Sequence, residues 1–282
     1  MKLWCTDYHS PSRGLSFCIE QTLYTENSEF QRIDIVETPD FGRVMLLDGV
    51  YMLGSKDEFV YHEMLSQPAL FCHPDPQRVL IIGGGDCGTL SMVLKHYHVQ
   101  EAVQVEIDEM VTRVSKEYFP QLCTCLSDSR AKLVFEDGIK YLRDHHDSFD
   151  VILIDSTDPV GPASGLFLRE FYEDCHRALR SDGILCIQSE SPWIDPLRDL
   201  ISQVNNDLCS LFPLVRPYLA AIQTYQAGLW MFQLASKKHD PLSVDAEQRV
   251  SQSSINFKYY NPEIHRACFA LPQFIKELVK TY

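Results

Sequence analysis

The order of apolar and polar residues divides the chain into two parts. Short strands are predicted for SFCIEQTLYTE, FQRIDIVET and GRVMLLDGVYML, with turns at ENSE, TPDFG and the pair Asp48-Gly49. The next segment, DEFVYHEMLSQPALFC, spaces its apolar residues as a helix does and has an acidic start that suits a helix N-terminus. We therefore expect an N-terminal β-domain at residues 1–57 and a second domain at residues 58–282.

From residue 78 the pattern alternates between strands and helices. Buried strands are predicted for RVLIIGG, AVQVEID, AKLVFED, FDVILIDST and GILCIQSES, and amphipathic helices for the segments between the first four and for FLREFYEDCHRALR. Such an order favours a parallel sheet covered on both faces. A terminal hairpin on that sheet is predicted for PYLAAIQTY and GLWMFQLASK. A polar loop is predicted for residues 238–252, and a closing helical segment for KYYNPEIHRACFALPQFIKELVK. The expected fold class is α/β, with a Rossmann-like, class I methyltransferase-like sheet after a small β-domain.

Charge and cysteine content narrow the function classes. Lys and Arg total 25 and Asp and Glu total 39, so the formal charge of −14 disfavours nucleic acid and anionic lipid as partners. The start, MKLWCTDYHSPSRG, lacks the pattern of a secretory signal, and no apolar run is long enough to span a bilayer. Ten scattered cysteines without a CxxC pair indicate buried thiols in a reducing compartment. We expect a cytoplasmic protein without a metal site.

Three consecutive strand ends carry residues suited to a nucleotide-type ligand. The loop from Gly83 through Gly85 and Asp86 to Gly88 follows a strand and opens a helix, so a ligand can approach its backbone closely. Twenty residues after Asp86, Glu106 ends the next strand, where an acidic residue commonly binds ribose hydroxyls. The third strand ends before Asp137-Gly138, where a carboxylate can accept from an adenine amino group. The carboxyl ends of parallel strands meet at one crevice, so these groups are expected to share one site.

Asp86 indicates which kind of ligand tail the glycine loop would accept. Class I methyltransferases have the same layout and bind S-adenosylmethionine, whose tail bears a carboxylate. That tail would lie at the glycine loop, where Asp86 would repel it. Asp86 instead favours a tail that ends in an ammonium group alone.

The fourth strand ends at Asp155-Ser156-Thr157-Asp158, followed by the sequence PVGPA. Two carboxylates three residues apart are a candidate acid/base or cation-binding set, and taken alone they fit an Asx-type turn with solvated side chains equally well.

At this point the sequence resembles the polyamine aminopropyltransferases, and the bacterial spermidine synthases in particular. The matching segments occur in the family's order over essentially the whole chain. They are DEFVYHEM (57–64), VLIIGGGDCG (79–88), VEIDE (105–109), EDG (136–138), IDSTDPVGPA (154–163), QSESPW (188–193) and KYYNPEIHRACFALP (258–272).

The resemblance implies an activity and a set of site residues. The expected reaction transfers the aminopropyl group of decarboxylated S-adenosylmethionine to putrescine, giving spermidine and methylthioadenosine, with no metal or redox cofactor. Small molecules would be the ligands, and the protein would be a homodimer or homotetramer. The carried-over residues are Gln31, Glu106, Asp137 and Gly138 for the nucleoside; His62 and Asp86 for the aminopropyl end; Tyr61, Asp155, Ser156, Asp158 and Tyr225 around the attacking amine; and Glu190, Trp193 and Trp4 at the far end of the diamine. Residues 156–167 would form a loop that closes over both substrates.

Within this reading Asp155 is the expected base, helped by Tyr61 and Ser156. A primary amine with a pKa near 10.4 is only about 1 part in 2,500 neutral at pH 7, and an aspartate near pKa 3.9 is a poor base for it. We therefore expect burial to narrow the gap between the two pKa values.

Two departures from the family pattern concern the shape of the glycine loop and the acceptor pocket. Cys87 stands where the family has a glycine, and Gln223-Thr224-Tyr225-Gln226 replaces Pro-Thr-Tyr-Pro. Cadaverine, agmatine or spermidine is therefore an alternative acceptor. A methyltransferase or a non-catalytic polyamine-binding protein is a more distant alternative.

Overall fold

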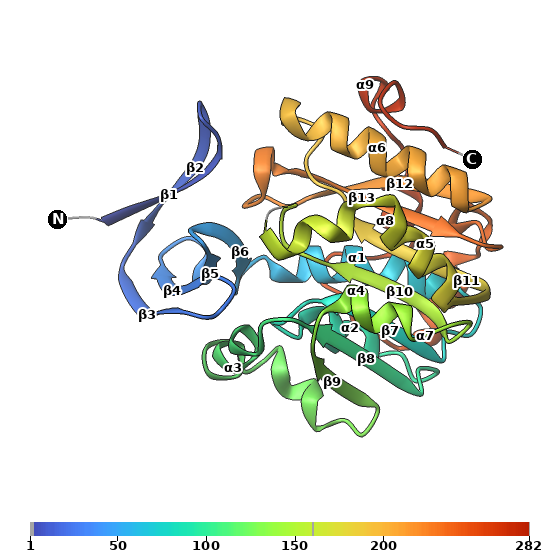
Figure 1. Cartoon of the computed structure of the whole chain (residues 1–282), viewed down its shortest axis with the longest axis horizontal. Helices are drawn as coiled ribbons and strands as arrows, with labels where there is room; N and C mark the ends of the chain where they lie inside the picture. The colour runs from blue at the N-terminus through green and yellow to red at the C-terminus, as the bar shows by residue number, and fades with distance from the viewer. Residues whose placement is uncertain (1–2, 160, 282) are drawn as a thin grey trace.

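The computed structural model describes residues 3–159 and 161–281, and its N-terminal domain consists of two small antiparallel sheets (Figure 1). A hairpin of two strands is followed by a four-stranded sheet in the order β3-β4-β5-β6. The strands are β1 (Leu3–Ser10), β2 (Arg13–Ile19), β3 (Gln21–Asn27), β4 (Arg32–Thr38), β5 (Gly42–Leu47) and β6 (Val50–Gly54).

The expected β-structure of this region is confirmed, with changes in detail. SFCIEQTLYTE forms parts of two strands, β2 and β3, which are separated at Glu20, and the sequence pattern did not indicate β1. Asp48 and Gly49 have φ angles of 52° and 85°, as a two-residue hairpin turn between twisted strands requires.

The second part contains a seven-stranded sheet in the order β12-β13-β11-β10-β7-β8-β9. Strands β7 to β11 are parallel, and β12 and β13 form the predicted antiparallel hairpin against β11. The strands are β7 (Arg78–Gly83), β8 (Glu101–Glu106), β9 (Ala131–Phe135), β10 (Phe149–Asp155), β11 (Leu179–Gln188), β12 (Leu214–Ala221) and β13 (Leu229–Ser236). The predicted α/β class is confirmed.

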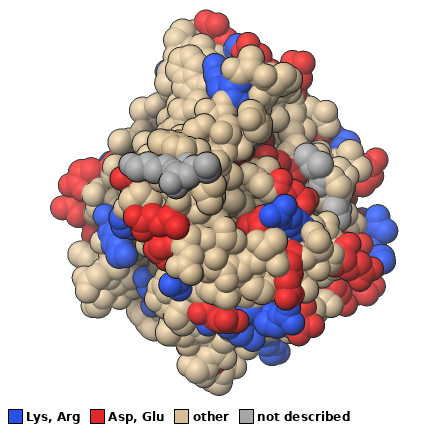
Figure 2. Space-filling model, turned by 90° about the vertical axis from the view of Figure 1, so that its left-hand side faces the viewer, with Lys and Arg blue, Asp and Glu red and all other residues tan. Residues whose placement is uncertain are grey.

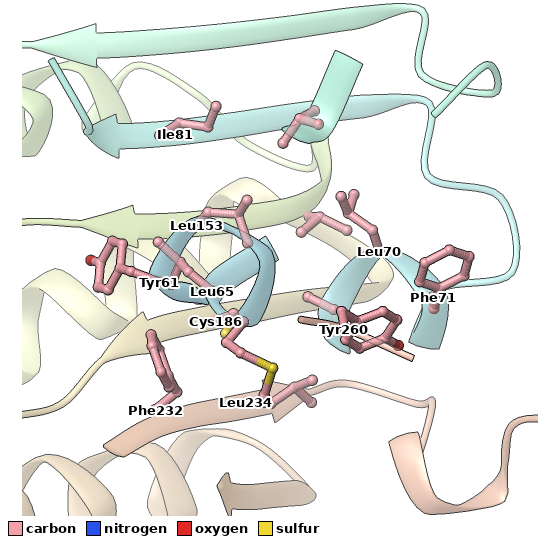
Figure 3. Close-up of a cluster of buried hydrophobic side chains, with 14 of the residues drawn as sticks. Tyr61, Leu65, Leu70, Phe71, Ile81, Leu153, Cys186, Phe232, Leu234 and Tyr260 are labelled. Carbon is pink, nitrogen blue, oxygen red and sulfur yellow. The ribbon is translucent and has the colours of Figure 1, made fainter. Parts of the chain in front are cut away.

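Helices cover both faces of this sheet because successive strand residues point to opposite sides. Ile81 and Leu153 pack with α1 and α2 on one face (Figure 3), while Leu80 and Ile152 pack with α4, α5 and α6 on the other. The helices are α1 (Glu58–Cys72), α2 (Gly88–Leu94), α3 (Glu109–Tyr118), α4 (Gly138–Arg143), α5 (Arg169–Ala178), α6 (Asp195–Leu211), α7 (Ala246–Ser253), α8 (Pro262–Ala267) and α9 (Gln273–Lys276).

Three segments differ from the expected elements. Helix α6 spans 17 residues and was not predicted. Residues 238–252 were expected to form a loop but include most of α7, which begins where the side chain of Asp245 accepts a hydrogen bond from the backbone N–H of Gln248. The C-terminal segment is helical only in α8 and α9, with Pro272 just before α9.

Helix α1 is buried from Val60 to Cys72, lying between the sheet and the C-terminal segment, where Phe71 stacks on Tyr260 (Figure 3). Pro68 lies inside this helix and has no N–H to offer the carbonyl of Met64. The hydroxyl of Tyr218 on β12 donates to that carbonyl at 2.6 Å. A side chain from the sheet thus replaces the missing helical hydrogen bond.

Helix α3 joins the two parts of the chain. Val111 and Phe119 share an apolar cluster with Ile33 and Met45 of the four-stranded sheet. Within the described residues no helix is long and apolar enough to cross a membrane. All ten cysteines lie in described segments, and each is free.

Candidate active site

A cavity of about 330 Å³ lies at the carboxyl ends of β7 to β10 and is walled by both parts of the chain. Its size is within the usual range for small-molecule sites. The β-domain contributes a mainly apolar wall that includes Phe30, Met45, Leu47 and Met52. The predicted residues on its surface are Gln31, Tyr61, Gly83, Gly85, Asp86, Glu106, Asp137, Gly138, Asp155, Ser156, Asp158 and Tyr225.

The glycine loop lets the ends of β7 and β10 approach closely. Gly83 has φ 85°, and a Cβ there would lie 2.1 Å from the carbonyl oxygen of Asp155. Cys87 has φ 70° immediately before α2, so a cysteine holds a left-handed conformation that glycine adopts at less cost. The sulfur-bearing residue is completely buried. The turn into α2 therefore places Cys87 in a backbone conformation that is strained for a residue with a Cβ.

Asp86 is held in place by its surroundings. Its Oδ1 accepts from the backbone N–H of Gly88 at 2.6 Å and lies 3.3 Å from Nε2 of His62. Nδ1 of His62 is 2.7 Å from Oε2 of Glu58. Burial disfavours the charged imidazole, but Asp86 and Glu58 outweigh it and hold the pKa of His62 well above its ordinary value. An imidazolium between two carboxylates fixes Asp86 at the cavity wall.

Glu106 and Gln31 lie on neighbouring parts of the cavity wall. Oε1 of Glu106 accepts from the backbone N–H of Asp108 at 2.8 Å, and burial raises the pKa of Glu106 to about 7. The side-chain amide of Gln31 donates to Oδ2 of Asp108 at 3.0 Å, and the hydroxyl of Ser28 donates to the same oxygen at 2.6 Å. Asp108, the N-cap of α3, thus connects the β-domain to Glu106 at the end of β8.

Asp137 caps helix α4 at the next strand end. Its Oδ1 accepts from the backbone N–H of Ile139 at 2.9 Å, and the residue lines the cavity. A Cβ at Gly138 would meet the side chain of Ile82 at 2.6 Å, so this position needs the smallest residue. Both predicted residues lie where a flat ring system could contact them.

Asp155 lies at the centre of the polar wall, and both of its oxygens accept from hydroxyl groups. Tyr61 donates to Oδ1 at 2.7 Å and Thr89 donates to Oδ2 at 2.6 Å. Burial and the nearby charge of Asp86 raise the pKa of Asp155, while the two hydroxyl contacts act in the opposite direction. The pKa of Asp155 is therefore shifted toward that of an amine, which is the direction that we expected from burial. The sequence did not indicate Thr89.

Tyr225 is fixed by hydrogen bonding, without the flanking prolines that the resemblance led us to expect. Its hydroxyl donates to the carbonyl of Met52 at 2.8 Å, and its ring lies 5.4 Å from that of Tyr61. The hydroxyl of the buried Thr224 donates to Oδ2 of Asp57 at 2.5 Å. Gln223 is exposed and outside the cavity wall. Side-chain hydrogen bonds therefore hold this loop.

The segment expected to close over the substrates forms one wall of the cavity. Thr157, Asp158, Ala163 and Leu166 line it, and Val160 lies outside the described residues. The buried hydroxyl of Ser156 has no hydrogen-bond partner, so a ligand can engage it.

A recess of about 30 Å³ shares Tyr61, Ser156, Asp158 and Tyr225 with the main cavity. Its other walls include three residues that the sequence did not indicate: Asp7, Gln188 and Trp230.

The recess is acidic, and its carboxyl groups are poorly solvated. Burial followed by the charge of Asp7 raises the pKa of Asp158 to about 6. Burial also raises the pKa of Asp7. Burial and Asp158 raise the pKa of Glu190, whose Oε2 has no hydrogen-bond partner. The indole N–H of Trp230 is likewise buried without an acceptor. Grouped carboxyl groups of this kind favour a cationic ligand.

Four of the predicted site residues lie outside the walls where we expected them. Trp4 is 63% exposed and lines neither the main cavity nor the recess, because alternate residues of a strand face opposite sides and Asp7 lies on the inward side of β1. Trp193 is 51% exposed and packs on Phe274. Glu190 is buried but outside the recess wall, where Gln188 lies; its positive φ of 62° turns the chain. His62 lies outside the main cavity wall and acts through Asp86.

The molecular surface on the β-domain side carries acidic side chains with basic ones scattered among them (Figure 2). The cavity wall itself carries acidic residues: Asp48, Asp86, Glu106, Asp137, Asp155 and Asp158.

Comparison with known proteins agrees with this geometry. Residues 3–54 match the spermidine synthase tetramerisation domain, and residues 58–246 match the spermine/spermidine synthase domain. Polyamine aminopropyltransferases of Caldicellulosiruptor bescii and Bacillus mycoides are each 46% identical over 280 residues, covering 99% of this chain and 99% and 100% of theirs.

A crystal structure of spermidine synthase in complex with the transition state analogue AdoDATO is 41% identical, has a TM-score of 0.95 and covers 98% of this chain and 94% of its own. The spermidine synthase of Thermotoga maritima, with the same identity and coverage, has a TM-score of 0.93. The chain therefore belongs to the spermine/spermidine synthase family, whose relatives are polyamine aminopropyltransferases, and it is a transferase.

Proposed function

We propose that this transferase is a spermidine synthase, which moves the aminopropyl group of decarboxylated S-adenosylmethionine to putrescine and releases methylthioadenosine. The observation that carries the proposal is the acidic recess next to Asp155. Its volume of about 30 Å³ has room for the end of a short chain but not for a further aminopropyl unit.

The main cavity fits the sulfonium substrate. Glu106 and Gln31 are placed to bind the ribose, and Asp137 and Gly138 the base. Asp86, positioned by His62, would bind the terminal ammonium of the aminopropyl chain. A carboxylate on that chain would meet Asp86 as a like charge, so intact S-adenosylmethionine is disfavoured.

The acceptor would enter between Asp155 and the recess. Its distal ammonium would be bound by Asp158 and Asp7, with Gln188 and the more deeply buried Glu190 behind them. A second positive charge would relieve the repulsion among these carboxyl groups, which a monoamine cannot do.

The reaction we propose is an in-line displacement at carbon. The attacking nitrogen forms the new C–N bond as the C–S bond breaks, and the bonding electrons leave on sulfur as neutral thioether. Asp155 takes the proton of the attacking amine, with Tyr61 and Ser156 orienting the nitrogen. Positioning of nitrogen, carbon and sulfur supplies the rest of the acceleration. The sulfonium is already a good leaving group, so we propose that neither a metal nor a redox cofactor takes part.

The same proposal covers assembly and location. The match of residues 3–54 to a tetramerisation domain supports a homo-oligomer built through the N-terminal β-domain, which we place at residues 1–57 before the catalytic domain at 58–282. Ten free cysteines support a reducing, cytoplasmic environment.

Incubation with decarboxylated S-adenosylmethionine and a panel of amines tests the acceptor. Spermidine from putrescine should dominate the products measured by mass spectrometry. A dominant cadaverine or agmatine adduct, or spermine from spermidine, would show that the recess selects another amine.

Two variants test how the diamine is bound. Asp7→Asn should raise the KM for putrescine by roughly 10- to 100-fold, because a charge-assisted contact contributes about 1.5–3 kcal/mol. Glu190→Gln should raise it as well, and a monoamine acceptor should respond much less in both cases. Glu37→Gln is the matched control, because it removes an acidic side chain of the β-domain outside the cavity walls. An Asp7→Asn variant with unchanged KM would contradict the proposed role of the recess.

A further inference from the structure

Three side chains of types that commonly bind metal ions lie close together at the end of the sheet that is opposite the cavity. His73 follows α1, Asp182 lies near the start of β11, and His239 follows β13. Nε2 of His73 is 3.8 Å from one oxygen of Asp182, and Nε2 of His239 is 3.5 Å from the other. One ligand atom of each residue lies within 4.8 Å of the other two. The ligands are far apart in sequence, which is why the sequence led us to expect no metal site.

We propose that His73, Asp182 and His239 bind one divalent transition-metal ion of the zinc class. Two imidazole nitrogens and a carboxylate oxygen suit zinc and its neighbours, whereas Mg²⁺ and Ca²⁺ prefer oxygen ligands. In a tetrahedral zinc site with bonds of about 2.0–2.1 Å, the ligand atoms lie about 3.3 Å apart. Small side-chain rotations would bring the three atoms to that spacing, with water as the fourth ligand.

An independent observation is the unsatisfied nitrogen of His73. This side chain is 4% exposed, and its Nε2 has no hydrogen-bond partner although it points toward Asp182. A buried polar atom without a partner is uncommon and costs stability, and a bound ion would remove that cost. Asp182 and His239 are partly exposed, which gives an ion a path from solvent.

Metal binding requires one change in hydrogen bonding. Nδ1 of His73 accepts from the backbone N–H of Asp75 at 3.2 Å, so Nε2 carries the proton of the neutral ring. Binding of a metal at Nε2 would move that proton to Nδ1. The hydrogen bond given up is long, and Asp75 is exposed, so water can accept from its N–H instead.

The ion would tie the C-terminal end of α1 to β11 and to the segment after β13. Helix α1 carries Tyr61 near its other end. The site is therefore structural: it would hold the helix against the sheet at a place remote from the reaction, and it does not depend on the identity of the acceptor amine.

Zinc titration of the full-length protein, stripped with a chelator and kept reduced, tests this inference. Calorimetry should give one ion per chain, and Co²⁺ in place of Zn²⁺ should give the visible spectrum of a four-coordinate site. At a hundredfold excess of Zn²⁺ over its Kd, the unfolding midpoint should rise by roughly 4–5 °C.

Two ligand variants and one control locate the ion. Asp182→Asn and His239→Ala should each weaken binding roughly tenfold or more and, at the same Zn²⁺ concentration, cut the thermal shift to about half or less. His98→Ala is the control, because His98 pairs with Asp75 at 3.4 Å on the surface and no third ligand joins them among the described residues. It should bind the ion as the unmodified protein does. Equal binding by all variants would place the ion on other residues and overturn the inference, as would the absence of saturable binding.

Discussion

Asparagine at position 155 keeps the shape of the side chain and removes its charge. Tyr61 can still donate to the remaining oxygen, while the new amide faces the hydroxyl of Thr89, which can turn to accept. The variant should therefore fold and bind both substrates, but it cannot take a proton from the amine.

The pH dependence of the reaction separates loss of the base from other damage. Deprotonating an amine of pKa near 10.4 costs about 4–5 kcal/mol at pH 7. Because the pKa of Asp155 is raised, proton transfer to this carboxylate offsets part of that free energy. Without the carboxylate only neutral amine reacts, and its fraction rises about tenfold per pH unit. We expect Asp155→Asn to lower kcat/KM for putrescine by roughly 10²–10³-fold at pH 7. That deficit should shrink by about tenfold per unit between about pH 7 and pH 9.

The assay measures kcat/KM for putrescine against pH with decarboxylated S-adenosylmethionine saturating. Thr89→Val is the matched control, because it removes a hydroxyl from Asp155 but leaves the carboxylate, so its profile should stay parallel to that of the unmodified enzyme. If the kcat/KM profile of Asp155→Asn against pH is also parallel to that of the unmodified enzyme, then Asp155 is not the proton acceptor.

Three further expectations concern binding and stability. Burial raises the pKa of Glu106 to about 7, and in the proposed site its ionised form would accept from ribose hydroxyls. Calorimetry should therefore show methylthioadenosine binding more weakly as pH falls below 7, with a limit of about tenfold per unit. Glu106→Gln should remove that dependence, and a persistent slope would assign it to another group. Cys87→Gly should be more stable than Cys87→Ala to denaturant by about 1 kcal/mol, because both lose the sulfur and only alanine keeps a Cβ at φ 70°. Tyr218→Phe should lower the free energy of unfolding by about 1–3 kcal/mol, because the Met64 carbonyl opposite Pro68 loses its partner; an unchanged midpoint would mean that water replaces the hydroxyl.

The strand ends of the catalytic domain were predictable because local rules determine them. Apolar runs followed by Gly83, Glu106, Asp137 and Asp155 place four site residues at one edge of a parallel sheet, whatever the packing of the rest. Helix α6 also had a usable signal, since Ile201, Val204 and Leu208 are buried at helical spacing, although the predicted elements did not include it.

The far end of the proposed acceptor site depends on tertiary structure and could not be predicted. Asp7 and Trp4 lie in one short strand, and which of them faces inward depends on how the β1–β2 hairpin sits on the rest of the protein. Likewise, the chain turns at Glu190, which has a positive φ, and Gln188 at the end of β11 lines the recess where Glu190 does not. A resemblance transfers residue types more reliably than it transfers the direction in which each side chain points.

The cavity is walled on one side by the four-stranded sheet and on the other by the glycine loop and its neighbours. A nucleoside bound as proposed would contact both domains at once and would act as a non-covalent cross-link between them. By linkage, any partner that immobilises the β-domain lowers the ordering cost of nucleoside binding, and a bound nucleoside strengthens that partner's hold to the same degree. Substrate affinity should therefore depend on protein concentration wherever copies of the chain associate through this domain.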